Sequence, residues 1–347
     1  MRRILVTGGM GFIGSALVRR LLAAHADVEV LNLDLLTYAA HPANLAELAR
    51  EPRYRFVRGD VRDARLVHAL AQGCWGVVHL AAETHVDRSL LDGSAFITAN
   101  VLGTYVVLAA ARDAGVQRVL VQSTDEVYGP TPEGVEVDEE APLSPRSPYS
   151  ASKLGAEMQA RAFYCSFGLP VVIARPMNTI GPRQHPEKAV PLFTINALLG
   201  EPIPLYGDGL QERDRFYVED HAAALDVLLH HGQPGEVYNV GAGNYALNRW
   251  VAERICELLG RPRDLIRPVA DRPGHDRRYR LNTAKLRALG WAPTVGLDEA
   301  LQRTVDWYRA NRAWWEPLRA QMQRGYYQRQ YGHRLAATET TGATTGG

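Results

Sequence analysis

Residues 3–14 read RILVTGGMGFIG, a short apolar run that passes directly into glycines spaced three residues apart. The apolar run predicts a buried strand, and Phe12–Ala24 predicts the helix that follows it. Gly8, Gly11 and Gly14 permit a tight turn and let backbone N–H groups approach a phosphate at the helix N-terminus. We therefore expect a strand–turn–helix unit that binds the pyrophosphate of a dinucleotide.

Beyond this unit, short apolar runs alternate with amphipathic segments through the first half of the chain. Such alternation indicates βαβ units and a parallel sheet. We predict a Rossmann-like, doubly wound α/β domain over residues 1–176, and a smaller C-terminal α/β lobe over residues 177–335 that binds substrate and is partly threaded back onto the sheet. Residues 336–347 lack apolar periodicity and are predicted to be a disordered tail. The predicted strands are 3–8, 28–34, 54–60, 76–82, 118–124, 169–176, 215–220 and 236–241, and the predicted helices are 12–24, 62–72, 100–114, 150–167, 192–199, 221–230 and 248–259.

The composition is that of an ordinary globular protein, with 46% hydrophobic residues, 22% charged residues and a net charge of +1. This balance leaves no electrostatic footprint for nucleic acid or an anionic membrane, so we expect neither as a partner. No stretch approaches the roughly 18 apolar residues of a membrane span. The apolar run at the start breaks at Gly8, too early for a signal peptide. A cytoplasmic location is therefore expected.

Three cysteines, Cys74, Cys165 and Cys256, stand far apart without C-x-x-C spacing. Their scatter argues against a disulfide framework and against a zinc site, and each is expected to be a small buried apolar residue. His85 and His275 stand alone and are expected to be structural or hydrogen-bonding residues. Since no cluster has metal-ligand spacing, no metal is expected.

Acidic residues end the second and third predicted strands. Asp34 lies about twenty residues beyond the glycine turn, where a carboxylate can bind the ribose hydroxyls of a dinucleotide. The same carboxylate would repel a 2′-phosphate, so the sequence favours NAD over NADP as the cofactor. Asp60 is suited to the adenine edge.

A tyrosine and a lysine stand four residues apart in SPYSASK, residues 147–153, at the start of a predicted helix. This spacing places Tyr149 and Lys153 on one face of that helix. A tyrosine with its ordinary pKa of about 10 is a poor base at neutral pH. A nearby ammonium group and a positive nicotinamide ring would lower that pKa, which makes Tyr149 a candidate proton acceptor.

Two neighbouring acids follow Thr124 in QSTDEVYG, residues 122–129, at the end of an apolar strand. Solvated acid pairs are common on protein surfaces and usually carry no function. An acid pair in a cavity can instead carry proton transfer. The residue pattern alone leaves both interpretations of Asp125 and Glu126 open.

The glycine turn, the strand that ends in Ser-Thr and the Y-x-x-x-K pattern together resemble the extended short-chain dehydrogenase/reductase superfamily. Within it, the chain most closely resembles the dTDP-glucose 4,6-dehydratase family of nucleotide-sugar dehydratases. The resemblance covers about residues 3–320 and rests on AAETHVDRSLLD, STDEVYG, SPYSASK, HPEKAVPLF, PLYGDG, YVEDH and DRPGHDRRY. It implies a hydro-lyase with tightly bound NAD that dehydrates a nucleoside-diphosphate hexose, most closely dTDP-glucose, to its 4-keto-6-deoxy product.

The resemblance also implies a role for each residue that can carry chemistry. Thr124 would hydrogen-bond the sugar oxygen, and Tyr149, with Lys153, would take the proton of the 4-hydroxyl while C4 passes a hydride to NAD. Glu126, ionised, would remove the C5 proton, and Asp125, protonated, would protonate the departing 6-hydroxyl. The hydride would then return to C6.

Further residues enter as binding residues because they match family positions. The implied cofactor-binding set is Gly8, Gly11, Phe12, Ile13, Gly14, Asp34, Leu36, Thr37, Asp60, Val61, Leu80, Ala81, Ala82, Tyr149, Lys153 and Thr179. The implied substrate-binding set is Thr84, Thr124, Asn178, Lys188, Ala189, Pro204, Leu205, Tyr206, Arg213, Asn248, Asp271, Arg272 and His275. The helices at about 100–114 and 150–167 resemble the pair that builds a four-helix interface in the family, which implies a homodimer.

The chain departs from the family pattern in three places. NTIGP carries Thr179 and Ile180 where the family usually has Asn and Tyr. RDRFYVEDH carries Arg215 and Phe216 in the stretch where the family usually has Trp, and Ala99 aligns with a family threonine. The first two departures lie beside the predicted sugar-nucleotide site, so they bear on the identity of the sugar and the base.

NTIGPR resembles a stretch of the related UDP-sugar decarboxylases and epimerases. A UDP-sugar 4,6-dehydratase, 4-epimerase or decarboxylase is therefore the alternative enzyme. A non-catalytic NAD-binding regulator is a more distant alternative from another class. The acid pair favours a dehydratase over epimerases and decarboxylases, and the intact Tyr–Lys pair favours an enzyme over a regulator.

Overall fold

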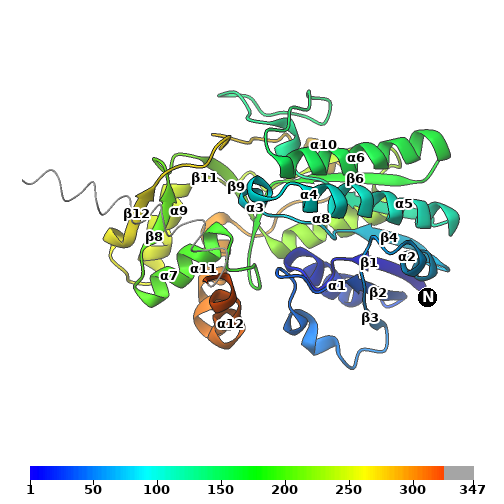
Figure 1. The fold of residues 1–347 in the computed structure, drawn as a ribbon, viewed down its shortest axis with the longest axis horizontal. Coiled ribbons are helices and arrows are strands. Elements are labelled where there is room, and N and C mark those ends of the chain that lie inside the picture. Colours follow the sequence, from blue (N-terminus) through cyan, green and yellow to red (C-terminus); the bar gives the residue numbers. More distant parts are fainter. Residues whose placement is uncertain (324–347) are drawn as a thin grey trace, which may run out of the picture.

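Seven parallel strands form the central sheet of the protein, whose computed structural model describes residues 1–323 (Figure 1). Their order is β10-β6-β5-β4-β1-β2-β3, so the chain reverses its direction across the sheet at β1. This order is that of a doubly wound fold and confirms the predicted fold class. The strands are β1 (Arg2–Thr7), β2 (Val28–Asp34), β3 (Tyr54–Arg58), β4 (Gly76–His79), β5 (Arg118–Gln122), β6 (Val171–Pro176) and β10 (Val237–Val240).

Helices cover both faces of this sheet. Ile4 and Val6 of β1 belong to one buried cluster and Leu5 to another, because successive side chains of a strand point to opposite faces. Burial on both faces explains why the first strand reads as a continuous apolar run. α1 (Phe12–Ala24) and α8 (Val218–His231) pack together on one face, and α2 (Ala64–Ala71), α5 (Gly103–Asp113) and α6 (Pro148–Phe167) pack on the other.

α6 begins two residues before its predicted start. Ser147 caps the helix, since its side chain accepts a hydrogen bond from the N–H of Ser150 at 3.0 Å, and Pro148 occupies the first helical position. Gly168, with a φ of +67°, ends the helix in the left-handed conformation. The early start places Tyr149 in the first turn of the helix.

A smaller lobe lies beyond the carboxyl ends of the strands, at the left of Figure 1. Its strands form a three-stranded sheet in the order β11-β9-β7 and a pair β12-β8. The predicted strand 215–220 is confirmed over 215–217, which end β9, and is wrong over 218–220, because α8 begins at Val218 with two acids in its first turn. The lobe contains β7 (Asn178–Ile180), β8 (Ile203–Tyr206), β9 (Glu212–Tyr217), β11 (Tyr245–Leu247), β12 (Ile266–Val269), α7 (Ala189–Leu199), α9 (Asn248–Leu258), α11 (Leu297–Ala310) and α12 (Arg312–Met322).

α8 and β10 follow residue 176 in sequence yet belong to the main sheet layer, so the chain crosses from the lobe back to the sheet. The predicted division into domains remains a prediction, and the predicted tail 336–347 lies outside the described residues.

Short helical turns connect these elements. They are η1 (Pro42–Leu48), α3 (Val86–Leu91), α4 (Ser94–Phe96), η2 (Ile97–Leu102), η3 (Asp125–Tyr128), η4 (Arg263–Leu265) and α10 (Ala284–Arg287).

One helical run corrects the expectation about membrane spans. Ser94–Asp113 runs through α4, the π-helical η2 and α5, and by length and composition alone it could cross a membrane. Half of its most apolar window is buried inside the protein. A core helix of a folded domain has the same length and composition, so this run is weak support for a membrane span.

The cysteines also differ in part from expectation. Cys74 and Cys256 are buried, as small apolar residues would be, whereas Cys165 on α6 is exposed. All three are free thiols.

Candidate active site

A cavity of about 640 Å³ lies at the carboxyl ends of the parallel strands, between the main sheet and the smaller lobe. This is where ligands bind in doubly wound folds. Most of the predicted site residues line it, although they come from both halves of the chain. They are Gly8, Gly11, Phe12, Ile13, Gly14, Asp34, Thr37, Asp60, Val61, Leu80, Ala81, Ala82, Thr84, Thr124, Asp125, Glu126, Tyr149, Asn178, Thr179, Lys188, Ala189, Pro204, Leu205, Tyr206, Arg213, Asn248, Arg272 and His275.

The glycine turn forms one end of the cavity. Gly8 has a φ of +76°, and a Cβ there would lie 2.7 Å from the backbone nitrogen of Ala81. A Cβ at Gly14 would lie 2.2 Å from the carbonyl oxygen of Gly8, so the turn closes only with glycine. Gly11 lines the cavity, and a Cβ there would approach the carbonyl oxygen of Gly8 at 3.2 Å and otherwise extend into open space.

The N-terminus of α1 is open to an anion. Gly11 occupies the cap position without a side-chain hydrogen bond, and the first turn holds no acidic residue. The first N–H groups of a helix carry a partial positive charge and lack partners within the helix. A phosphate entering the cavity would therefore find donors at this turn.

Asp34 holds the glycine turn in place as well as lining the cavity. Its carboxylate accepts hydrogen bonds from the N–H groups of Met10 at 2.9 Å and Leu36 at 2.8 Å. Burial raises its pKa, and these two hydrogen bonds oppose that rise. Asp60 accepts hydrogen bonds from the Arg62 guanidinium, which holds the pKa of Asp60 below its ordinary value.

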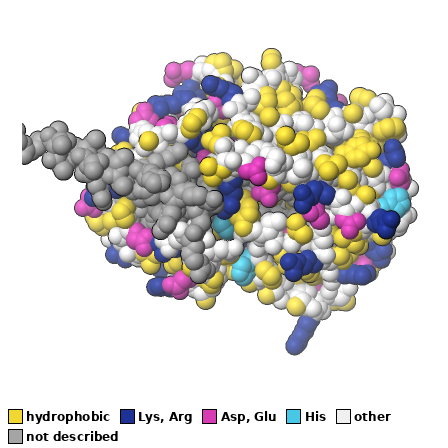
Figure 2. Space-filling model, in the orientation of Figure 1, with side chains coloured by type: hydrophobic (Ala, Val, Ile, Leu, Met, Phe, Trp, Pro, Cys, Tyr) yellow, Lys and Arg dark blue, Asp and Glu magenta, His cyan; other side chains and the backbone are white. Residues whose placement is uncertain are grey.

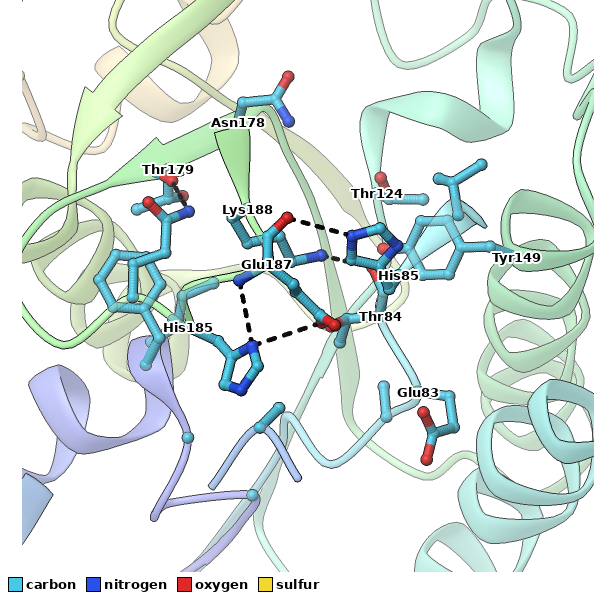
Figure 3. A pocket seen from close by; sticks show the side chains of 18 of the residues that line it. Glu83, Thr84, His85, Thr124, Tyr149, Asn178, Thr179, His185, Glu187 and Lys188 are labelled. Carbon is cyan, nitrogen blue, oxygen red and sulfur yellow. Dashed lines mark hydrogen bonds and ion pairs between the residues drawn. The ribbon is translucent and has the colours of Figure 1, made fainter. Parts of the chain in front are cut away.

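Thr124 and Tyr149 lie close together in the cavity (Figure 3). Burial raises the pKa of Tyr149, the Glu126 carboxylate raises it further, and the hydrogen bond with Thr124 lowers it. We expected Lys153 to lower the pKa of Tyr149, but within the protein itself burial raises this pKa and is the largest influence on it. Lys153 donates a hydrogen bond to the carbonyl of Gln122 at 2.5 Å, and burial lowers its pKa to about 8.

The acid pair lies inside the cavity rather than on the surface. Asp125 is 3% exposed, and its Oδ1 accepts a hydrogen bond from the Thr124 hydroxyl at 3.1 Å. Its Oδ2 is buried without a hydrogen-bond partner among residues 1–323. Burial and the neighbouring Glu126 raise the pKa of Asp125 to about 8, so this carboxyl holds its proton at neutral pH.

Glu126 has a different electrostatic environment from its neighbour. Burial raises its pKa above the ordinary value, and Arg272, Arg213 and Lys188 oppose part of that rise. Of these three cations, only Arg213 is among the groups that lower the pKa of Asp125. The cations therefore favour a negative charge on Glu126 and leave the shared proton on Asp125.

Cations line the half of the cavity formed by the smaller lobe. Lys188 donates a hydrogen bond to the carbonyl of Thr84 at 2.9 Å, and Arg213 donates to the carbonyls of Glu212 and Asp276 at 2.7 Å each. Arg213 is buried and Lys188 is half-buried, and these hydrogen bonds go to neutral carbonyl oxygens. Cations withdrawn from water without a paired anion are costly, so this wall suits an anionic ligand.

Arg272 is held by an acid from the main domain. Its Nη1 donates to Asp87 at 2.8 Å, and the Tyr206 hydroxyl donates to the other oxygen of the same carboxylate at 2.8 Å. Asp87 is buried, and it joins two residues of the smaller lobe to α3. The sequence patterns did not single out Asp87, although it stands within AAETHVDRSLLD.

Three predicted residues do not line the cavity. Leu36 donates its N–H to Asp34 and has a φ of +58°, so it shapes the loop instead. Lys153 follows Tyr149 by about one turn of α6 and donates a hydrogen bond to a carbonyl of β5. Asp271 bonds to Gln211 at 2.9 Å and to His275 at 2.6 Å, so it supports the cavity wall from outside.

The sequence patterns did not predict a polar cluster around Glu187, which lines the cavity. The Arg88 guanidinium lies 3.8 Å above the Tyr38 ring and pairs with Glu187 at 2.9 Å. Burial raises the pKa of Glu187, but His85, His185 and Lys188 outweigh it and hold the pKa at about 2 (Figure 3). A signal was present for Glu187, since it precedes Lys188 in HPEK, but its partners lie about one hundred residues away in sequence.

The family departures lie on the cavity wall, except Phe216, which is fully buried. The Thr179 hydroxyl is 2.8 Å from Nδ1 of His221. The Arg215 guanidinium bonds to Asn248 and to the carbonyl of Ala246 at 3.0 Å. Ala99 and Ile180 contribute apolar side chains to the wall of the cavity. The departures therefore change the lining of the site and leave Thr124, Tyr149 and the acid pair intact.

One group of three potential metal ligands lies away from the cavity. Nitrogen or oxygen atoms of His25, Asp226 and His230 lie within 4.8 Å of one another. The sequence spacing could not reveal this group, because His25 follows α1 and the others lie on α8. Asp226 is hydrogen-bonded to His25 and to Arg20 at 2.9 Å each, so hydrogen bonding accounts for the arrangement without a metal.

Comparison with known proteins gives consistent matches over most of the chain. The family model described as GDP-mannose 4,6 dehydratase matches residues 5–304. A dTDP-glucose 4,6-dehydratase from Streptomyces niveus is 46% identical over 323 residues, which cover 92% of this chain and 96% of that relative.

Solved structures agree with the sequence matches. DesIV, a dTDP-glucose 4,6-dehydratase from Streptomyces venezuelae solved with NAD bound, is 50% identical, with a TM-score of 0.89 and coverage of 91% of this chain and 99% of that one. A UDP-glucose 4-epimerase from Thermus thermophilus, in complex with NAD, is 36% identical, with a TM-score of 0.82 and coverage of 89% and 99%.

Proposed function

The chain belongs to the dTDP-glucose 4,6-dehydratase family, and from this membership we propose that it dehydrates dTDP-glucose to dTDP-4-keto-6-deoxyglucose with NAD as its cofactor. The reaction oxidises C4, eliminates water across C5 and C6, and reduces C6. The enzyme is thus a hydro-lyase that ends each turnover with its cofactor in the starting state.

The observation that carries the proposal is the acid pair in the cavity. Asp125 and Glu126 directly follow Thr124, and one carboxyl has a pKa raised to about 8 while three cations act on the other. Elimination of water needs a base for the C5 proton and an acid for the leaving hydroxyl. Two neighbouring carboxyls with different environments can supply both.

The residues of the glycine turn fit NAD. Gly11 leaves room in the cavity that a side chain would fill, and the N-terminus of α1 offers N–H donors for a pyrophosphate. Asp34 at the end of β2 suits ribose hydroxyls and disfavours a 2′-phosphate. When bound, NAD supplies the hydride acceptor and donor at the sugar and a positively charged ring.

The chain's own residues then divide the proton transfers. We assign Tyr149 to accept the proton of the 4-hydroxyl, with Thr124 bonded to the same oxygen and Lys153 about one turn further along α6. The 4-ketone that results acidifies the C5 proton, which Glu126 removes. Asp125 gives its proton to the 6-hydroxyl, which leaves as water. As the hydride returns to C6, Glu126 returns a proton to C5.

The diphosphate is assigned to the cations of the smaller lobe. Lys188, Arg213 and Arg272 line the cavity near Glu126, and a nucleoside diphosphate supplies negative charge to all three. Tyr206, with Pro204 and Leu205, offers an apolar wall for the base. These assignments follow the family positions and the lining of the cavity.

The protonation of Asp125 predicts a pH dependence. As a general acid, Asp125 must carry its proton, and the protonated fraction falls as the pH rises through about 8. We expect an infrared carbonyl band of a protonated carboxyl at pH 6 that disappears through about pH 8 and is absent from Asp125→Asn at every pH. A band lost near pH 4, the ordinary range of an aspartate, would contradict the assignment.

The alternative enzyme is a 4-epimerase or decarboxylase acting on UDP-sugars, since an epimerase shares this fold with a TM-score of 0.82. Those reactions need C4 oxidation but no acid for a leaving 6-hydroxyl. A protonated, buried Asp125 would then serve no chemical step. The acid pair therefore favours dehydration over the alternative, and the intact Tyr149 and Lys153 disfavour a non-catalytic regulator.

A substrate comparison tests the proposal. The purified protein is incubated separately with dTDP-glucose, UDP-glucose, UDP-glucuronate and GDP-mannose, and the products are analysed by mass spectrometry. We expect loss of water and a 4-keto product with dTDP-glucose. Epimerised or decarboxylated product, without dehydration of any hexose nucleotide, would overturn it.

We also propose that two copies of the chain associate through the helices on one side of the sheet. Figure 2 shows hydrophobic side chains gathered over α4, α5 and α6. Most of the large exposed hydrophobic residues of the described chain lie on this α3–α6 face. They are Leu90, Leu91, Ile97, Leu102, Tyr105, Met158, Tyr164 and Phe167.

A charge on the α3–α6 face should separate the copies. Leu102 is 48% exposed, and Leu102→Glu would bury a carboxylate in the proposed interface. We expect light scattering to give twice the chain mass of 38.4 kDa for the wild type and a single chain mass for the variant. Trp250→Glu, on α9 outside this face, is the control and should leave the mass unchanged; a wild type of single-chain mass would contradict the proposal.

A cytoplasmic location remains part of the proposal, supported by the free thiols.

A further inference from the structure

Two guanidinium groups lie side by side in the wall of the cavity. Arg213 and Arg215 stand two residues apart on β9, so both point to the same side of the strand. Both line the cavity, and only 7% and 4% of their respective surfaces are exposed. The sequence patterns marked Arg213 as a substrate residue and Arg215 only as a departure from the family.

Arg215 forms no ion pair with an acid among residues 1–323. Its guanidinium donates to the carbonyls of Ala246 at 3.0 Å and Arg213 at 3.4 Å, and to the side-chain oxygen of Asn248. Asp214, between the two arginines, faces the other way, where backbone N–H groups of residues 242–244 bind its carboxylate at 2.7–2.9 Å. The strand therefore turns both charges toward the cavity and the acid away from it.

A chain of hydrogen bonds connects Arg215 to the loop that contains Asp271 and His275, which borders the cavity. The side-chain oxygen of Asn248 accepts a hydrogen bond from Arg215, so the Asn248 amide nitrogen donates to the side-chain oxygen of Gln211 at 3.4 Å. Gln211 donates to Asp271 at 2.9 Å, and Asp271 bonds to His275 at 2.6 Å. Loss of the arginine would free the orientation of the Asn248 amide.

We propose that Arg215 is a specificity-determining residue that makes binding depend on the second phosphate of the ligand. Two adjacent buried cations are repelled by each other and gain most from a ligand with more than one negative charge. The tryptophan usual in the family supplies no charge at this position. The inference rests on the proposed function, because it takes the substrate to be a nucleoside diphosphate.

Calorimetric titration of the NAD-loaded protein with thymidine, dTMP and dTDP tests this assignment. In Arg215→Gln we expect the dissociation constant for dTDP to rise about tenfold or more, since charge-assisted hydrogen bonds are lost. The constant for dTMP should rise less, and that for thymidine should stay within about twofold. The KM for dTDP-glucose should rise while kcat changes little, and Arg215→Lys should recover part of the dTDP affinity.

The control is Arg277→Gln, which removes an exposed guanidinium that pairs with Asp208 outside the cavity. It should leave all three dissociation constants unchanged. Equal losses for thymidine, dTMP and dTDP in Arg215→Gln would show a packing role and overturn the proposal, as would an unchanged affinity for dTDP. If Arg215→Gln does not fold, Arg215→Lys decides: a loss of affinity that is larger for dTDP than for thymidine, with dTDP still bound more tightly than dTMP, supports the charge role. Equal losses for thymidine, dTMP and dTDP in Arg215→Lys, or unchanged affinity for all three, contradict it.

Binding is measured without turnover, so this result and the substrate comparison are independent. If no hexose nucleotide is dehydrated, the proposed function fails. The dependence on the second phosphate can still be present in that case, and the same titration with uridine, UMP and UDP reads it for the alternative base.

Discussion

Glu126→Gln is expected to oxidise the sugar at C4 and then stop. The glutamine amide keeps the shape of the side chain but cannot accept the C5 proton, so elimination should slow by about 10²–10⁴-fold. Tyr149 and Thr124 remain intact, and therefore the first step continues. The reduced nicotinamide should accumulate on addition of dTDP-glucose, where its absorbance reports the stalled reaction.

Solvent exchange at C5 gives the direct measure of this substitution. In deuterated water the wild type should introduce deuterium at C5 of the product, whereas Glu126→Gln should not exchange that position. Glu133→Gln is the control, because this carboxylate is 92% exposed on a nearby loop and should leave exchange unchanged. Undiminished exchange in Glu126→Gln would remove Glu126 from the role of base.

Tyr149→Phe is expected to stop the reaction before C4 oxidation. The substitution removes the phenolic oxygen that, when ionised, accepts the proton of the 4-hydroxyl. Asp125, which is also hydrogen-bonded to Thr124, cannot replace it because Asp125 holds its proton at neutral pH. Turnover should fall by about 10²–10⁴-fold or more. Reduced nicotinamide should not accumulate, which distinguishes this variant from Glu126→Gln.

Binding should survive the loss of the Tyr149 hydroxyl. The affinity for dTDP and the NAD content of the protein should match those of the wild type within about twofold, because the ring keeps its contact with Phe96. Tyr164→Phe, on the same helix but 39% exposed, is the matched control and should keep full turnover. A kcat for Tyr149→Phe within tenfold of the wild type would exclude Tyr149 as the proton acceptor.

Local patterns in the sequence predicted the parts of the fold that local physics decides. β1, the glycine turn and α1 follow from one apolar run and three glycines, and the predicted helix Phe12–Ala24 has the observed bounds. The start of α6 was missed by two residues because Ser147 and Pro148 together extend the helix backward. Such errors at helix ends arise because capping, unlike periodicity, depends on single residues.

Elements that depend on distant partners were not predictable in the same way. β8 and β12 are four residues each and are stabilised by pairing with each other, between Ile203 and Ile266 at one end. A four-residue strand leaves no clear period in the sequence. The helical run Ser94–Asp113 was predicted too short, since its π-helical turn at Ile97–Leu102 and the Gly103 that follows obscure the pattern.

The same distinction holds for the site. The Thr124, Asp125 and Glu126 triplet is contiguous, so sequence alone could single it out. Asp87, in contrast, gains its place only when the fold brings Arg272 and Tyr206 against it. The opposing charge environments of Asp125 and Glu126 likewise come from cations in distant segments and could be assigned only from the structure.

The fate of the hydrogen on C4 tests the central claim, that the acid pair turns C4 oxidation into dehydration, most directly. The protein is given dTDP-glucose that carries deuterium at C4, and the product is analysed by NMR. The account predicts deuterium at C6 of a 4-keto-6-deoxy sugar, because the hydrogen removed from C4 returns to the carbon that lost its hydroxyl. Deuterium found at C4 of an epimerised sugar would contradict it.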